Sequence, residues 1–182
     1  MTRTLSPDVQ IRPTRLAHMV LRVRNLECSI AWYHDVVGMD VVHGNPKIAF
    51  MSHDEEHHRL ALLQTPVEEE APEGSPGLDH VAFAFDTFGD LLSTYTRLEG
   101  LGMQPYWSIN HGPTTSFYYR DPDGNGVELF VDNFETEAEL KGWMNSEAFA
   151  ANPIGVFFDP KRLIERYEAG DALEDLVQQG SA

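Results

Sequence analysis

The chain has 182 residues, 42% of them hydrophobic, and its 29 acidic and 13 basic side chains give a net charge of −16. This length and composition are typical of one globular domain with or without an appendage, and the acidic balance argues against a nucleic-acid-binding protein, because phosphate contacts require clustered lysine and arginine. No apolar run reaches the roughly 18 residues of a membrane span and the N-terminus is polar, so we expect a cytoplasmic protein without a membrane partner.

The first half of the chain reads as a strand, a helix and three short strands. Residues 15–23 alternate between apolar and polar side chains, which predicts a half-buried strand. Asn25 is a typical cap for a helix that ends at Gly38. Turn residues then separate three short runs with strand character, over 39–43, 47–51 and 58–64.

The second half repeats this order after an acidic, proline-rich loop at 65–77. A strand is predicted over 78–85 and a helix over 87–99. Three further strands are predicted near 103–109, 115–119 and 126–131. His18 and His80 keep the same place in the two halves, 62 residues apart. Such self-similarity indicates that one supersecondary unit is used twice.

The tail after Asp132 has a different character, with helical patterns near 135–144, 161–169 and 171–178. Four large aromatic side chains make it too apolar to remain in solvent: Trp143, Phe149, Phe157 and Phe158. We reason that the two unit helices already occupy the outer faces of a small module. Residues 133–182 are therefore expected to form a helical extension packed on the module or on a neighbouring subunit. We expect it to cover part of the cavity entrance or an intersubunit contact, in a homo-oligomer.

Three side chains predict a metal site. His18 and His80 lie near the start of the first strand of each unit, and Glu128 lies in an apolar strand at the end of the second unit. A carboxylate in such a strand is costly unless it faces a cation or another partner. Two imidazoles and one carboxylate suit divalent iron or manganese. A single histidine in a strand is more often a hydrogen-bonded core residue than a metal ligand, but the repeated placement of these two favours metal ligands.

The duplicated unit resembles the vicinal oxygen chelate superfamily. The resemblance rests on the run Leu-Asp-His-Val-Ala-Phe at 78–83 and on Phe-Tyr-Tyr-Arg-Asp-Pro-Asp-Gly-Asn-Gly-Val-Glu-Leu-Phe at 117–130, and it covers residues 14–132. This superfamily includes glyoxalase I, fosfomycin-resistance enzymes, bleomycin-binding proteins and type I extradiol dioxygenases. The resemblance implies an α+β fold in which two βαβββ units, 14–64 and 78–132, form one curved mixed sheet around a cavity, with both helices outside.

Several residues favour the ring-cleaving dioxygenases within the superfamily. An overlay of Phe50 on Tyr118 places Leu60 opposite Glu128, at the position where glyoxalase I supplies a fourth ligand, so the resemblance implies three ligands only. Tyr118 is similar to a tyrosine that holds a substrate oxygen in those dioxygenases. His111 resembles the histidine that shares this task.

His58 resembles the acid–base histidine of these enzymes, and strand alternation predicts that it shares the metal-lined face with Leu60. The resemblance thus implies catalytic roles for His58, His111 and Tyr118, and Fe(II) as the metal, with Mn(II) as an alternative.

The function implied is an extradiol dioxygenase that inserts O2 into a small aromatic diol of the catechol type, next to its vicinal hydroxyls. A non-oxidative member of the superfamily, either an isomerase, an epimerase or a thiol transferase, stays open as an alternative because fosfomycin-type transferases share the ligand set. A drug-binding resistance protein is disfavoured by the metal triad. The substituents on the aromatic ring are not predicted.

Overall fold

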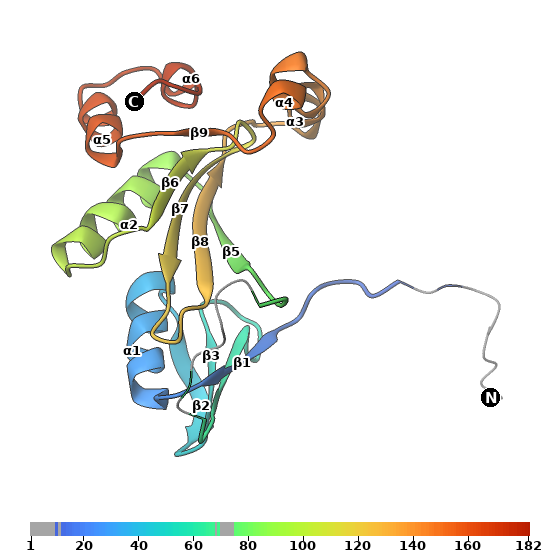
Figure 1. Ribbon diagram of the computed structural model, residues 1–182, viewed down its shortest axis with the longest axis vertical. Coiled ribbons are helices and arrows are strands. Elements are labelled where there is room, and N and C mark those ends of the chain that lie inside the picture. The colour runs from blue at the N-terminus through green and yellow to red at the C-terminus, as the bar shows by residue number, and fades with distance from the viewer. Residues whose placement is uncertain (1–9, 11, 68, 70–74) are drawn as a thin grey trace.

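Each repeated unit forms a sheet of its own in the computed structural model, which describes residues 10, 12–67, 69 and 75–182 (Figure 1). The first sheet has the order β1-β4-β3-β2 and contains β1 (Met19–Val23), β2 (Asp40–Asn45), β3 (Ile48–Ser52) and β4 (Leu60–Gln64). The second sheet has the order β5-β8-β7-β6-β9 and contains β5 (His80–Phe85), β6 (Trp107–Asn110), β7 (Thr114–Arg120), β8 (Gly126–Asp132) and β9 (Val156–Phe157). The βαβββ order of both units is confirmed.

The two unit helices begin and end where local sequence signals place them. The α1 helix (Leu26–Val37) starts after Asn25, whose side chain accepts a hydrogen bond from the Cys28 amide. It ends at Gly38, where φ is 75°, a conformation that glycine adopts without strain. The α2 helix (Phe88–Gly100) is capped by Thr87 in the same way.

The prediction of one continuous curved sheet is wrong. β1 pairs with β4 and β5 pairs with β8, both in parallel, and each first strand forms an edge of its own sheet. The units meet instead through α1 and the turn before β8. There the Tyr33 hydroxyl donates to Asp121 over 3.0 Å, and Arg24 pairs with Asp123 over 2.8 Å.

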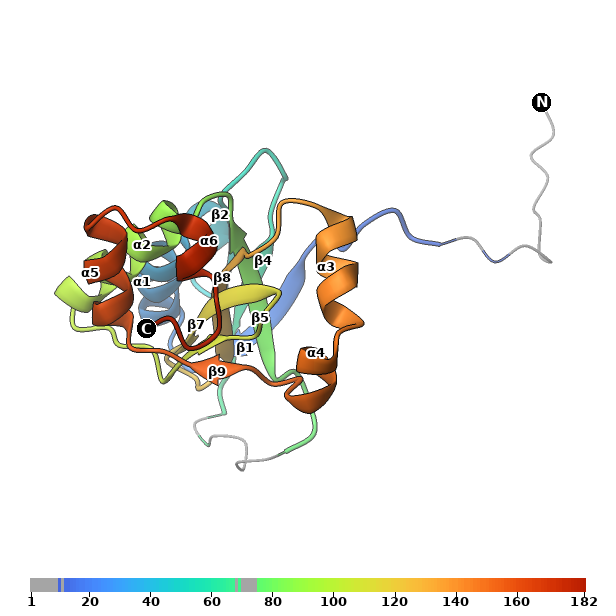
Figure 2. The same cartoon turned by 90° about the horizontal axis from the view of Figure 1, so that it is seen from above.

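The tail contains four helices and the short strand β9. Its helices are α3 (Glu137–Met144), α4 (Glu147–Ala151), α5 (Pro160–Glu168) and α6 (Leu173–Leu176). Seen from above, α5 lies on the same side of the sheets as α1 and α2, whereas α3 and α4 lie on the opposite side (Figure 2). The tail is therefore not wholly helical, since β9 extends the second sheet by pairing with β6.

The outer face of the second unit is shared by α2 and the tail. Leu163 and Leu176 are each 1% exposed and belong to the hydrophobic core. The Phe158 ring lies 5.4 Å from that of Phe117 in β7. The reasoning that the unit helices already fill the outer faces is thus wrong for the second unit, because α2 leaves part of its sheet for α5 and α6 to cover.

In the part of the chain that the structure describes, no helix is both long enough and apolar enough to cross a bilayer. The polar N-terminal residues 1–9, and residues 68 and 70–74 of the acidic loop, lie outside the described residues.

Candidate active site

His80 and Glu128 face one another on neighbouring parallel strands. Glu128 of β8 stands opposite Ala82 of β5, and the His80 Nε2 atom lies 3.1 Å from the Glu128 carboxylate. Glu128 is only 7% exposed. The other ring nitrogen, Nδ1, lies 2.7 Å from the Asp79 carboxylate. A carboxylate that accepts a hydrogen bond from one ring nitrogen orients the histidine ring and leaves the other nitrogen available to bind a metal, as is usual for histidine ligands.

Tyr118 and His111 extend this pair into a chain of polar contacts. Tyr118 of β7 is the cross-strand partner of Glu128, and its hydroxyl lies 2.9 Å from the His111 Nε2 atom. Burial raises the pKa of Tyr118 far above its usual value of 10, and the neighbouring Glu128 charge raises it further. Tyr118 therefore stays protonated and keeps one proton to donate. The second ring nitrogen of His111 contacts the backbone carbonyl of Ile154 in the tail.

Trp107 also belongs to this group, although the sequence analysis did not select it. Its ring centroid lies 4.9 Å from that of Tyr118 and 5.6 Å from that of His111. Its indole Nε1 atom is buried with no hydrogen-bond partner among the described residues. In the structure Trp107 pairs with Tyr118 across β6 and β7, and the correct register would have identified it from the sequence. The strand was predicted to begin near residue 103, whereas β6 begins at Trp107. Asp79 was also missed, although its place directly before His80 was a usable signal.

His18 lies in a separate cluster of histidines on the first unit. Its ring centroid is 4.3 Å from that of His58 and 6.4 Å from that of His57. The His58 ring also contacts Phe50 of β3, with 4.9 Å between centroids. Burial lowers the pKa of His58, and the charges of His18 and His57 lower it further. The geometry therefore favours the neutral form of His58.

The position in the first unit that corresponds to Glu128 is Ala61, not Leu60. Val20 pairs with Ala61 in the first sheet just as Ala82 pairs with Glu128 in the second. Leu60 is 1% exposed and points into the hydrophobic core. The assignment of Leu60 to this position is wrong by one residue. Alanine offers no ligand either, so the inference that no fourth ligand comes from this strand is unchanged.

The structure does not bring His18 to the other two predicted ligands. Among the described residues, no hydrogen bond or ring contact joins His18 to His80 or Glu128, and no three His, Cys, Asp or Glu side chains lie close enough to hold a metal ion. His18 lines a pocket at the seam between the sheets, with Ala82 and Phe83 of β5 on the other wall. The three-ligand set stays a prediction. Within one chain, His80 and Glu128 lie together, whereas His18 lies apart from them.

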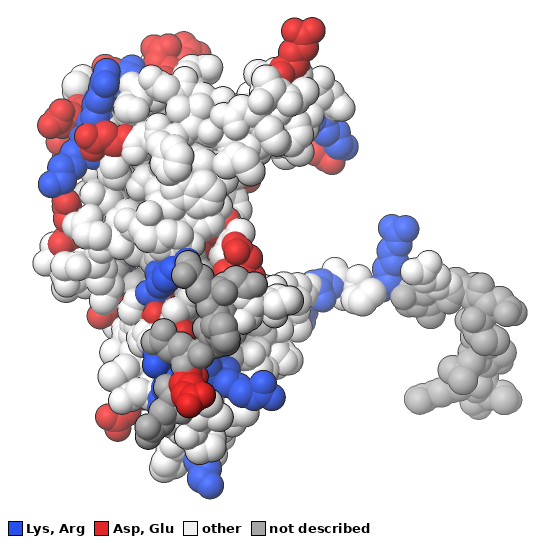
Figure 3. Space-filling model, in the orientation of Figure 1, with Lys and Arg blue, Asp and Glu red and all other residues white. Residues whose placement is uncertain are grey.

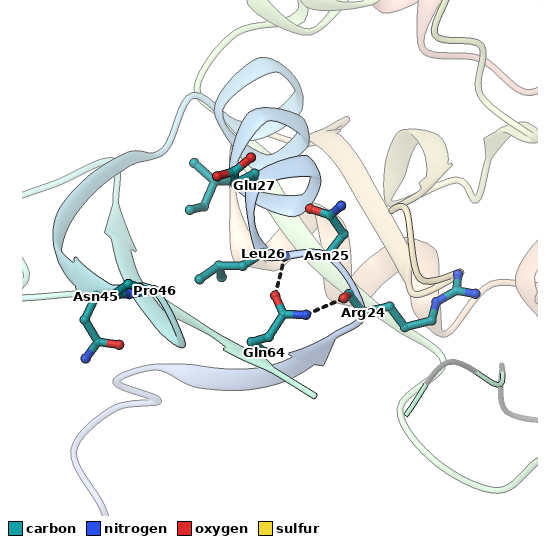
Figure 4. A pocket seen from close by; sticks show the side chains of 8 residues that line it. Arg24, Asn25, Leu26, Glu27, Asn45, Pro46 and Gln64 are labelled. Atoms are coloured by element: carbon teal, nitrogen blue, oxygen red, sulfur yellow. Dashed lines mark hydrogen bonds between the residues drawn. The ribbon is translucent and has the colours of Figure 1, made fainter. Parts of the chain in front are cut away.

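A different pocket lies at the start of α1 and contains none of the predicted site residues (Figure 4). The Gln64 side chain crosses it, accepting a hydrogen bond from the Leu26 amide and donating one to the Arg24 carbonyl. These bonds connect the end of β4 to the turn before α1, so the polar groups in this pocket have a structural role.

Paired βαβββ units, with a histidine that faces a buried carboxylate, agree with the family comparison: the chain belongs to the glyoxalase/bleomycin resistance protein/dioxygenase superfamily, whose model matches residues 15–129. It is 47% identical over 171 residues to biphenyl-2,3-diol 1,2-dioxygenase 3 of Rhodococcus globerulus, covering 92% of this chain and 90% of that one. Biphenyl-2,3-diol 1,2-dioxygenase 2 of the same organism is 43% identical, covering 90% and 86%.

Solved structures show the same fold. A glyoxylase/bleomycin resistance protein/dioxygenase domain from Frankia sp. EAN1pec superposes with a TM-score of 0.58 at 20% identity, covering 71% of this chain and 99% of that chain. A lactoylglutathione lyase from Agrobacterium tumefaciens gives 0.53 at 24% identity, covering 65% and 94%. At these identities the likeness concerns the fold alone.

Proposed function

We propose that the chain is an Fe(II)-dependent extradiol dioxygenase that inserts O2 into a catechol-type ring next to its two hydroxyls. The observation that carries this proposal is the 47% identity to a biphenyl-2,3-diol 1,2-dioxygenase over 92% of the chain, which includes most of the tail. Biphenyl-2,3-diol is therefore the first substrate to test. The cytoplasmic location stays a prediction.

The donor set of the site fits ferrous iron. Glu128 is a nearly buried carboxylate whose neighbours in β8, Val127 and Leu129, belong to the hydrophobic core, so a cation there would offset the cost of its burial. His80 is oriented by Asp79, and His18 would be the third ligand. Two imidazoles and one carboxylate leave positions open for a substrate. Manganese fits the same donors.

We further propose that the complete site forms between two copies of the chain. Among the strands that the structure describes, β1 and β5 each pair on one side only, so each offers an edge to another strand. Large apolar side chains are exposed on or just before these strands: Leu16 (79%), Val20 (54%) and Leu78 (63%). Pairing the β1 region of one copy with the β5 region of another would cover them and place His18 beside His80 and Glu128.

The roles of the other residues follow from their contacts. Bound iron would supply a template for the diol and O2 and a route for electrons between them. Tyr118 and His111 lie beside Glu128 and would hold a substrate oxygen. Burial lowers the pKa of His58, and its imidazole would accept and return a proton. Because His58 contacts His18, association of two copies would bring both histidines to His80 and Glu128 of the other copy.

The test is metal analysis of anaerobically purified protein followed by measurement of oxygen uptake. We expect about one iron per chain and uptake of O2 with biphenyl-2,3-diol and catechol, but none with biphenyl-2-ol, which lacks the second hydroxyl. Ring cleavage is followed by the absorbance of the product. If iron-loaded protein consumed no O2 with any vicinal diol, and instead isomerised a thiohemiacetal or transferred a thiol, the proposed function would be wrong.

A further inference from the structure

The tail is built into the surroundings of His111 from two directions. On one side, β9 pairs with β6, so that Val156 stands opposite Asn110 directly before His111. On the other side, Trp143 of α3 lies against Gly112: a Cβ atom added to that glycine would meet the Trp143 ring at 1.9 Å. Figure 3 shows the resulting arm of α3 and α4 overhanging the hollowed side of the molecule. The loop that carries His111 is thus held between two tail segments.

The contact with the tail determines where the proton of a neutral His111 ring resides. The Nδ1 atom of His111 contacts the carbonyl oxygen of Ile154, and a carbonyl oxygen only accepts hydrogen bonds. Nδ1 must therefore carry the hydrogen. In the neutral ring this leaves Nε2 as an acceptor, so the 2.9 Å contact with the Tyr118 hydroxyl is a hydrogen bond only if Tyr118 donates. The Glu128 carboxylate is a second acceptor for the same proton, so a Tyr118 proton that is held by His111 is withdrawn from Glu128.

The Ile154 carbonyl is presented by a small turn that Asn152 organises. The Asn152 Oδ1 atom accepts from the amides of Ile154 and Gly155, at 3.2 and 3.1 Å, and its Nδ2 donates to the Gly155 carbonyl over 2.7 Å. Gly155 has a φ of 116°, and a Cβ there would lie 2.3 Å from the Asn110 carbonyl oxygen. The turn therefore has little freedom to move relative to His111.

We propose that the tail is a positioning element of the active site: the Ile154 carbonyl fixes His111 as the Nδ1–H tautomer, which turns the Tyr118 proton toward His111. The Tyr118 oxygen is then a hydrogen-bond acceptor on the side of His80 and Glu128. In the opposite tautomer, His111 would donate and Tyr118 would become a donor on that side. A diol hydroxyl that approaches Tyr118 meets an acceptor only in the first case. This last step rests on the proposed dioxygenase function, whereas the tautomer assignment does not.

The tautomer is measured directly by 15N NMR of the histidine rings in full-length protein, prepared metal-free and again with diamagnetic zinc. Spectra are recorded at alkaline pH, where histidine rings are neutral, and the His111 signals are identified by their absence in His111→Gln. We expect the Nδ1–H form in the wild-type protein. Asn152→Ala should raise the Nε2–H population, and so should Gly155→Ala, whose added Cβ displaces the peptide next to Ile154.

Two variants serve as controls. Asn152→Asp keeps the oxygen that accepts from both amides and should retain the Nδ1–H form. The Asn145 side chain donates to the Lys141 carbonyl and bonds to no described residue outside the tail, so Asn145→Ala should match the wild-type spectrum. An Nε2–H tautomer in the wild-type protein, or an unchanged tautomer in both Asn152→Ala and Gly155→Ala, would overturn the proposal.

Kinetics then separate the positioning role from the proposed function. With an active enzyme, Asn152→Ala should lower kcat/KM for the diol by roughly 10-fold, as expected for losing an outer hydrogen-bond partner, and Asn152→Asp should restore it. A changed tautomer with unchanged kinetics would refute the positioning role. If no variant, including the wild type, oxidised a diol while the NMR result held, the dioxygenase proposal would fail and the tail contact would stand.

Discussion

A site shared between two copies predicts that two inactive variants restore one another. His18→Ala removes the ligand proposed for the first unit, and Glu128→Ala removes one proposed for the second unit. In a mixed dimer, one site receives both substitutions and the other receives neither. The second site is native, because His18 belongs to the histidine cluster with His58 and Glu128 to the separate pair with His80.

The expected recovery follows from the statistics of pairing in a two-fold dimer. Random exchange at equal concentrations makes about half of the dimers mixed, and each has one native site of two, so about a quarter of wild-type activity should return. A mixture of wild type with the double variant His18→Ala/Glu128→Ala gives the complementary measurement. In those mixed dimers both sites lack a ligand, so activity should fall to about a quarter, whereas sites contained within one chain would leave about half.

Chains are exchanged by co-expression, the mixed dimers are verified by intact mass spectrometry, and oxygen uptake with biphenyl-2,3-diol and bound iron are measured on the same samples. Iron content should rise with activity, because the restored site regains all three ligands. If verified mixed dimers showed no activity above the separate variants, while the second mixture kept about half, the site would lie within one chain. The seam between β1 and β5 would then have to close to bring His18 to Glu128.

Five further substitutions test individual steps. Glu128→Gln should lose iron and activity while the circular dichroism spectrum stays that of the folded chain. His58→Phe should retain iron and slow turnover by a factor on the order of 10². Leu163→Ala should lower the free energy of unfolding by about 2–5 kcal/mol in urea titrations, because Leu163 is 1% exposed, whereas Leu173→Ala, at a 52% exposed position, should change it little. Burial, and then the Asp121 charge, raise the pKa of Tyr33 above its value in the unfolded chain. The contribution of Tyr33 to the free energy of unfolding is therefore present below about pH 10 and is lost as the pH rises further. Tyr33→Phe should make the free energy of unfolding fall less steeply between pH 9 and 11.

The elements of the fold were predictable because their signals are local. The cap at Asn25, the stop at Gly38 and the alternation of the strands depend on neighbours a few residues away. Whether β1 and β5 pair with one another depends instead on contacts between units, such as that of Tyr33 with Asp121, which no local pattern reveals. The same holds for β9, whose two residues carry too little alternation to predict a strand.

The site was predictable to the extent that it follows from the repeat. The overlay of Phe50 on Tyr118 was correct, since these residues pair with Ala61 and Glu128 respectively. The error at Leu60 arose because the first unit has one residue more than the second between the two paired positions. That additional residue is taken up in the irregular segment 53–59, where strand alternation does not apply. His58 thereby reaches His18 even though Leu60 points into the core.

The arrangement of the two units links folding, association and metal binding. Each unit forms its own sheet but carries only part of the proposed site, with His18 and His58 on one and His80 and Glu128 on the other. The contacts through α1 hold the units together while leaving the edges of β1 and β5 free. Free, apolar edges favour association, and if the proposed site forms between two copies, iron would bind more tightly to the assembly with all three ligands than to a chain with two. By linkage, iron would then strengthen the association as much as association strengthens the binding of iron.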